Sequence, residues 1–250
     1  MKRILVLTVL LLSGNLFAQD VAVLLKEASN FERLLKDDQA LEKYNSVLAA
    51  DPSNLQALVR SSEICSALGA RQADKNARQV FYDKANDFAV KALGVDSNNA
   101  DANYVRAVVA GKLTEVETDN KKLVADIKDI KTYADKALAI NPNHARANYI
   151  LGRWHYQMIT MPWTKKAAMK VLFGRMPEAT IENAFKYMEK CRTLEPYYVL
   201  NFLDLAKAYK YDNQPSKAIE VLNQLVKLPT RTADDVALKA EGKKLLSEMQ

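Results

Sequence analysis

The rarest side chains of this 250-residue chain gather in one short stretch. Residues 151–174, LGRWHYQMITMPWTKKAAMKVLFG, contain both tryptophans, Trp154 and Trp163, and one of the two histidines, His155. The other histidine, His144, lies 11 residues before His155. Imidazoles can bind metals or transfer protons, and indoles can stack on a ligand. This stretch is therefore the first place to look for a chemical site.

The spacing of these residues argues against metal binding and catalysis. Two histidines 11 residues apart lack the close spacing of a zinc motif such as His-x-x-x-His. The two cysteines, Cys65 and Cys191, lie far apart in the sequence, and we expect both to be buried free thiols. The sequence shows neither a Ser/His/Asp or Cys/His nucleophile pattern nor a glycine-rich phosphate loop. We predict a protein that is not an enzyme and that has no metal or cofactor.

The amino-terminal residues have the pattern of a secretory signal. Lys2 and Arg3 precede an apolar run over residues 4–12, and a small residue, Ala18, follows. This pattern predicts a cleaved signal peptide over residues 1–18 and an exported, periplasmic domain over residues 19–250. The net charge of +6 is mild and the chain has no long basic run, so we expect no nucleic-acid partner.

Four turn-like stretches recur along the chain and indicate a helical repeat. The acidic or amide residues Asp51, Asp96 and Asn141 lie 45 residues apart in three of them, and Glu195 holds the corresponding place in the fourth. Two of these stretches are followed by the same Ala-x-Ala-Asn-Tyr motif, at residues 100–104 and 145–149. Each stretch separates two segments with helical patterning, as in an array of helical hairpins.

The units resemble the tetratricopeptide repeat, a helix–turn–helix of 34 residues. The middle units exceed that length, two of them by 11 residues, which is close to three helical turns at about 3.6 residues each. The third exceeds it by 20 residues, enough for an additional helix. We predict an all-α tetratricopeptide-like superhelix with elongated helices and one inserted helix. Its units span about residues 21–54, 55–99, 100–144, 145–198 and 199–231, with a cap helix at 232–249.

In such arrays the first helix of each unit lines a concave groove. The repeat register places a mixture of aromatic, aliphatic and basic side chains there, while His155 falls at a packing position. The candidate groove residues are Tyr104, Arg146, Tyr149, Arg153, Tyr156, Gln157, Leu203, Lys207 and Lys210. This mixture suits an extended peptide with a carboxylate, or a lipid with an anionic head group. The alternative is that some of these side chains pack against a neighbouring unit.

The insertion over residues 162–173 has the pattern of a short amphipathic helix. Pro162 suits its first turn, Trp163 belongs to its apolar set, and Lys165, Lys166 and Lys170 are expected to point outward. We expect this helix to cover the end of the groove and to bury Trp163. The alternative is peripheral contact with an anionic membrane surface.

Several features of this region resemble the regulator of microtubule dynamics family. They are Gly152-Arg153-Trp154, Tyr156-Gln157, Trp163, Lys165-Lys166, Leu172-Phe173 and Pro177-x-Ala-Thr, and the similarity extends over Asn141–Leu246. The resemblance implies a tetratricopeptide-like domain and the lipid binding that one family member performs with that domain. The family roles in microtubule association and organelle tethering are not expected of an exported protein. His155 stands where eukaryotic members often have cysteine, and the chain opens on a signal-like segment instead of a membrane anchor and coiled coil.

The patterns together predict a binding protein. Its main predicted function is to hold a partner protein or peptide in the concave groove. The alternative is a phospholipid- or fatty-acid-binding protein that uses the same groove.

Overall fold

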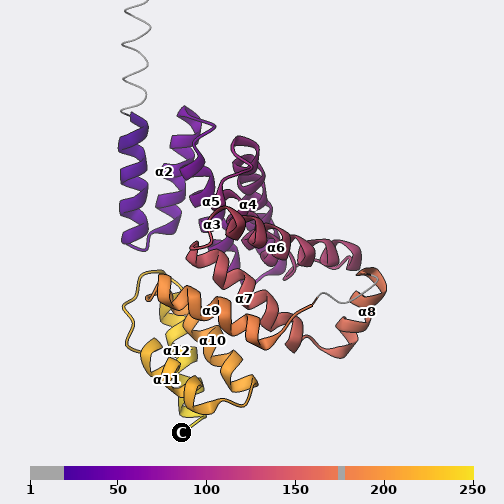
Figure 1. Ribbon diagram of the computed structural model, residues 1–250. Coiled ribbons are helices and arrows are strands. Elements are labelled where there is room, and N and C mark those ends of the chain that lie inside the picture. Colours follow the sequence, from indigo (N-terminus) through magenta and orange to yellow (C-terminus); the bar gives the residue numbers. More distant parts are fainter. Residues whose placement is uncertain (1–19, 174–177) are drawn as a thin grey trace, which may run out of the picture.

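A computed structural model describes residues 20–173 and 178–250, so the predicted signal peptide lies outside the described residues. Every regular element within these two ranges is a helix, and the helices follow one another in a curved array (Figure 1). The predicted all-α, tetratricopeptide-like helical-repeat architecture is confirmed.

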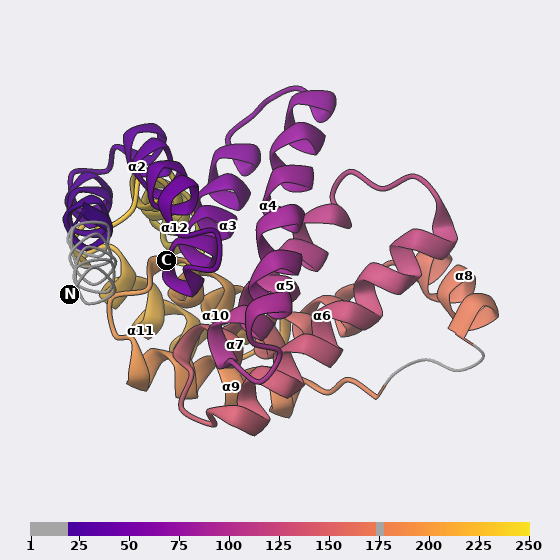
Figure 2. The same ribbon diagram turned by 90° about the horizontal axis from the view of Figure 1, so that it is seen from above.

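The helices pair as hairpins along the chain. A helix over residues 20–33 precedes α2 (Asp37–Ala50), and α12 (Asp235–Ser247) packs on the last hairpin. The hairpins are α3 (Leu55–Ala70) with α4 (Lys75–Val95), α5 (Ala100–Leu113) with α6 (Asn120–Ile140), α7 (Ala145–Thr160) with α9 (Ile181–Leu194), and α10 (Val199–Tyr211) with α11 (Pro215–Leu225). The inserted helix, α8 (Trp163–Phe173), lies between α7 and α9 in the sequence and contacts α6. Seen from above, the first and last helices lie on the same side of the array (Figure 2).

The regular 45-residue spacing recurs in the caps of three first helices. The side chains of Asn54, Asn99 and His144 accept hydrogen bonds from the backbone N–H three residues later, at 3.1, 3.0 and 3.1 Å. These bonds satisfy N–H groups that a helix start would otherwise leave unpaired. His144 is therefore a capping residue of α7 in this structure.

The asparagines of the shared Ala-x-Ala-Asn-Tyr motif hold the turns in place. The Asn103 side-chain amide donates to the Ser97 carbonyl at 2.9 Å, and the Asn148 amide donates to the Pro142 carbonyl at 3.2 Å. Both asparagines are buried, so these bonds offset the cost of removing an amide from water. Each tyrosine that follows is thereby fixed on the inner face of its helix.

Small residues allow the two helices of a hairpin to approach closely. A Cβ atom at Gly152 of α7 would lie 2.7 Å from Met188 Cγ and 3.0 Å from the Ala184 carbonyl oxygen of α9. The 11-residue extensions appear as longer second helices, since α4 and α6 each have 21 residues, against 14 in α2 and 14 in α9.

Candidate ligand-binding groove

The inner helices surround a cavity of about 560 Å³. The helix at residues 20–33 and the helices α3, α5, α7 and α10 contribute to its lining, together with the turn before α12. Four of the predicted groove residues are among the lining residues: Tyr104, Arg146, Tyr149 and Arg153. The repeat register therefore brings side chains from successive units to one surface, which we call the groove.

A chain of alternating charges crosses the floor of the groove. Arg60 pairs with Glu32, with 3.1 Å between Nε and Oε1, and also with Glu63. Arg146 joins Glu63 to Glu195 at 3.2 and 3.1 Å. Burial raises the pKa of Glu63, but the Arg60 and Arg146 guanidiniums outweigh burial and hold that pKa below its usual value. Glu63 is therefore ionised and fixes both arginines.

A second polar cluster joins α7 to α10. The Tyr149 hydroxyl donates to Asp204 Oδ2 at 2.7 Å, and Arg153 donates to the Tyr149 oxygen at 3.2 Å. Burial, with the nearby Asp204 charge, raises the pKa of Tyr149 well above its usual value, although Arg153 acts in the opposite direction. Tyr149 therefore stays protonated and keeps donating to Asp204.

The groove is more acidic than the sequence led us to expect. The predicted lining had aromatic, aliphatic and basic groups, whereas Glu32, Glu63 and Glu195 also line the cavity and pair with its arginines. A signal was present in the sequence, because Glu63 stands eight residues after the start of α3, as Arg153 does in α7. The same register applied to the earlier unit would have found it.

An ion-pair cluster joins the two ends of the array across the groove. Arg71, which follows α3, donates to both carboxylate oxygens of Asp234 at 2.6 and 3.2 Å and lies 2.7 Å from Asp37 Oδ2. Asp37 begins α2, while Asp234 immediately precedes α12. These contacts close the array into a ring at this point, a feature that the sequence did not predict.

Several predicted groove residues have other positions. Leu203 is buried in the core, because α10 is surrounded by α7, α9, α11 and α12. Tyr156 packs edge-on against Tyr211 with 6.0 Å between ring centroids. Lys207 and Lys210 extend toward α12 and lie 2.8 and 3.8 Å from Glu241 and Glu248. The packing around α10 therefore places these four side chains outside the groove lining, which corrects the prediction that they line it.

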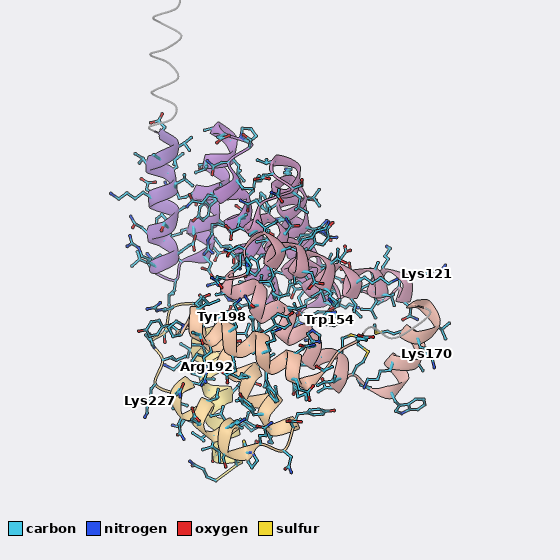
Figure 3. All side chains as sticks on the ribbon, viewed as in Figure 1. Lys121, Trp154, Lys170, Arg192, Tyr198 and Lys227 are labelled. Atoms are coloured by element: carbon cyan, nitrogen blue, oxygen red, sulfur yellow. The ribbon has the colours of Figure 1, made fainter. Side chains whose placement is uncertain are left out.

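The two tryptophans have opposite environments, which corrects the predicted role of α8 as a lid. Trp154 is 3% exposed and donates from Nε1 to the Ile127 carbonyl at 3.1 Å, whereas Trp163 is 79% exposed. The helix turns Met169 toward α6 and so directs Trp163 and Val171, which is 83% exposed, away from the protein. Figure 3 shows Trp154 within the body of the molecule and Lys170 near its outer end.

A second cavity of about 380 Å³ lies between α6, α7 and α8. Its lining is mainly apolar and includes Ile127, Met158 and Met169, and the predicted groove residue Gln157 is found here instead. Lys166 donates from Nζ to the Ile159 carbonyl at 2.9 Å and so ties α8 to the end of α7. The side chain of Lys165 is outside the described part of the structure.

His155 is a packing residue, as its register predicts. It is 5% exposed, stacks on Tyr187 with 5.9 Å between centroids, and accepts from the Thr180 N–H at 3.4 Å through Nδ1. Burial first, and the Lys131 charge second, lower its pKa to about 4. Within residues 20–173 and 178–250 we find no group of three or more His, Cys, Asp or Glu side chains that could hold a metal ion.

The sequence of this chain is similar to known proteins over most of its length. The family model for regulator of microtubule dynamics proteins 1–3 matches residues 24–250. The chain belongs to the regulator of microtubule dynamics family. It is 28% identical over 224 residues to protein 1 of Mus musculus, with 89% of this chain and 71% of the relative covered. It is 23% identical over 191 residues to protein 1 of Caenorhabditis elegans, covering 76% and 84% of the two chains.

Solved structures confirm the repeat fold of this family member. A thermophilic tetratricopeptide-repeat protein of Thermus thermophilus superposes with a TM-score of 0.65 at 14% identity, covering 91% of this chain and 99% of that chain. PilW, a type IV pilus biogenesis factor, superposes with a TM-score of 0.56 at 18% identity, covering 92% and 90%. Among the described residues, no helix is long and apolar enough to cross a membrane.

Proposed function

We propose that this family member is a non-enzymatic binding module that holds an extended peptide segment of a partner protein in the groove. The observation that carries the proposal is the mixed lining of the cavity. Paired arginines and glutamates alternate there with Tyr104, Tyr149 and Tyr198. A peptide offers backbone donors and acceptors, charges and apolar side chains, so it complements such a lining along its length.

The charged lining favours a peptide over an acyl chain in the groove. An acyl chain laid on Arg60, Glu63 and Arg146 would remove these ions from water without giving them new hydrogen bonds, which is unfavourable. The lipid alternative fits the smaller cavity near α8 better, because that lining is mainly apolar. Organic extraction of the purified protein, followed by mass spectrometry, tests this alternative: stoichiometric lipid would place it ahead of the peptide proposal.

Site-specific photo-crosslinking tests the groove directly. A benzoylphenylalanine at Val108, which lines the cavity, should crosslink to extended segments of partner proteins. The matched control carries the same group at Val90, which is exposed on α4 outside the groove lining. Mass spectrometry of the crosslinked peptides should recover short contiguous segments of partner proteins when the crosslinker replaces Val108, and none when it replaces Val90. Equal capture by both variants would contradict the proposal.

A second candidate, contact of α8 with an anionic membrane surface, is supported by the outward position of Trp163 and Val171. Lys170 is exposed on the same helix, and Lys121 and Lys122 are exposed at the start of α6, the helix that α8 contacts. Exposed apolar side chains among lysines are typical of helices that lie in a membrane interface. The signal-like residues 1–18 support an exported location for the protein, and export stays a prediction.

A further inference from the structure

Most cations that line the groove are neutralised by carboxylates of the chain itself. Arg60 and Arg146 pair with glutamates on the floor, Arg153 lies 3.7 Å from Asp204, and Arg71 pairs with Asp234. Arg33 and Arg231 differ, because neither guanidinium forms an ion pair with a carboxylate in the described part of the chain. Their surroundings decide which of the two is positioned for an anionic ligand.

Arg231 is held in place by the turn that carries it. The buried carboxylate of Asp235 accepts from the backbone N–H of Arg231 at 2.7 Å and from that of Thr232 at 2.9 Å. The Arg231 guanidinium lies over the Tyr197 ring, 4.0 Å from its centroid. Stacking through the face of a guanidinium leaves its N–H groups directed outward at the edge. The side chain is therefore positioned before any ligand binds.

The nearby carboxylates are already committed to other groups. Asp234 is held by Arg71 at 2.6 Å, and Asp235 accepts from the turn. Neither forms an ion pair with the Arg231 guanidinium. Arg33, in contrast, is exposed on the helix at residues 20–33 and bonds only to the Asn30 side chain among the described residues. Arg33 thus lacks the aromatic platform and the fixed turn.

Apolar side chains complete the same cavity. Leu200, Leu238 and Ile150 line it together with Arg231 and Tyr197. A ligand that fits this lining presents an anion to the guanidinium and an apolar group to the leucines and isoleucine. A planar carboxylate matches the fork of N–H donors on arginine.

We propose that Arg231 binds a carboxylate of the peptide in the groove and makes the protein selective for segments that join an acidic group to an apolar side chain. The carboxylate is either an Asp or Glu side chain or the free carboxyl terminus. This inference rests on the peptide-binding function proposed above. Arg231 is then a specificity-determining residue, whereas Arg146 and Arg153 maintain the groove.

An array of short synthetic peptides tests this selectivity with the full chain. The peptides carry Glu or Gln beside Leu, and each is displayed with a free and with an amidated carboxyl terminus. The wild-type protein should prefer either the Glu peptides or the free termini, and this difference identifies which carboxylate is bound. Arg231→Gln should reduce the preference about tenfold, the effect of losing one charge-assisted bidentate contact. Arg231→Lys should retain part of it.

Matched variants separate this contact from a general charge effect. Arg33→Gln removes the same charge from another unpaired groove arginine and should leave the preference unchanged. Tyr197→Leu keeps Arg231 but removes its platform, and should lower the preference less than Arg231→Gln does. Equal losses in Arg33→Gln and Arg231→Gln would overturn the inference, and circular dichroism establishes that each variant is folded.

The array also distinguishes the two proposals. Peptide binding without any carboxylate preference would overturn the role of Arg231 and leave the peptide-binding function standing. Binding of no peptide, while the crosslinker at Val108 also captures none, would overturn both.

Discussion

The groove and helix α8 differ in the kind of side chain that each buries and exposes. The groove buries charged groups, and each charge on its floor is matched by another, as Glu63 is matched by Arg60 and Arg146. Helix α8 exposes apolar groups, and Trp163 projects into solvent while Trp154 is buried. The groove is therefore held in shape by its own contacts. The exposed apolar face of α8 does not stabilise the fold. Such a face indicates contact with another molecule or a membrane.

The largest expected effect is on the groove floor, through Glu63→Gln. This change removes the carboxylate that joins the partly buried Arg60 and Arg146, so that among the described residues Arg60 keeps only Glu32 and Arg146 keeps only Glu195 as an ion-pair partner. Breaking a buried ion pair by removing one partner should lower the free energy of unfolding by about 3 kcal/mol. Urea denaturation measures it, with Glu178→Gln on an exposed side chain as the control. A loss no larger than that of the control would show that the charges do not support the groove.

The next effect concerns His155, which lies on α7 between the two regions. Its pKa is about 4 in the folded protein and about 6.5 in an unfolded chain. Between these values the unfolded state binds a proton that the folded state does not, so stability falls as the pH falls. The free energy of unfolding should drop by about 2 kcal/mol from pH 7 to pH 5 through this residue.

Urea denaturation of the wild type and of His155→Gln at both pH values isolates the contribution of His155. Other acidic groups titrate in both proteins, so the difference between the two pH dependences belongs to His155. Parallel pH dependences would contradict the burial of a neutral imidazole.

A smaller effect is expected where Arg71 closes the ring. Arg71→Gln removes contacts to Asp37 and Asp234 that are partly exposed, so stability should fall by about 1 kcal/mol. The ends of the array should also separate more freely. Electron–electron resonance between spin labels at Gln39 and Val236 should give a broader distance distribution in Arg71→Gln than in the wild type. Arg71→Lys is the control that keeps the charge.

The sequence predicted the parts of the site that follow from local repetition. Tyr104 and Tyr149 lie 45 residues apart at the same register position, and each Asn-capped or His-capped helix start repeats the same geometry. The groove position of Glu63 could have been predicted from the same register, because it corresponds to Arg153 in α7. Regular spacing on successive helices is sufficient to place such residues on one face.

The remaining parts depend on relations between distant elements. Arg71 and Asp234 are 163 residues apart, and they meet only because small rotations between successive units add up to a closed curve. The sequence pattern of α8 shows that it has an apolar face, but not which neighbour will cover that face. Met169 occupies the position against α6, and Trp163 is left outside.

The smallest expected effect on stability is that of Trp163→Ser. Because this indole is 79% exposed, its removal should change the free energy of unfolding by less than about 0.5 kcal/mol. Trp154→Phe should be more harmful, because it loses the hydrogen bond to the Ile127 carbonyl in a buried site. Urea denaturation of the two variants therefore contrasts an exposed indole with a buried one directly. A large loss with Trp163→Ser would mean that α8 packs its tryptophan after all.

The same two tryptophans test the membrane candidate, because Trp163 reports on the exposed face of α8 and Trp154 on the buried packing between α6 and α7. In Trp154→Phe the remaining emission comes from Trp163, which should be readily quenched by acrylamide in solution. Vesicles with phosphatidylglycerol should shift that emission to shorter wavelength and protect it from quenching, whereas phosphatidylcholine vesicles should do so less, since the lysines favour an anionic surface. In Trp163→Phe the buried Trp154 should respond to neither vesicle. Identical responses of the two variants would contradict a specific membrane contact of α8. A response confined to Trp163 would assign the exposed face of α8 to a lipid surface.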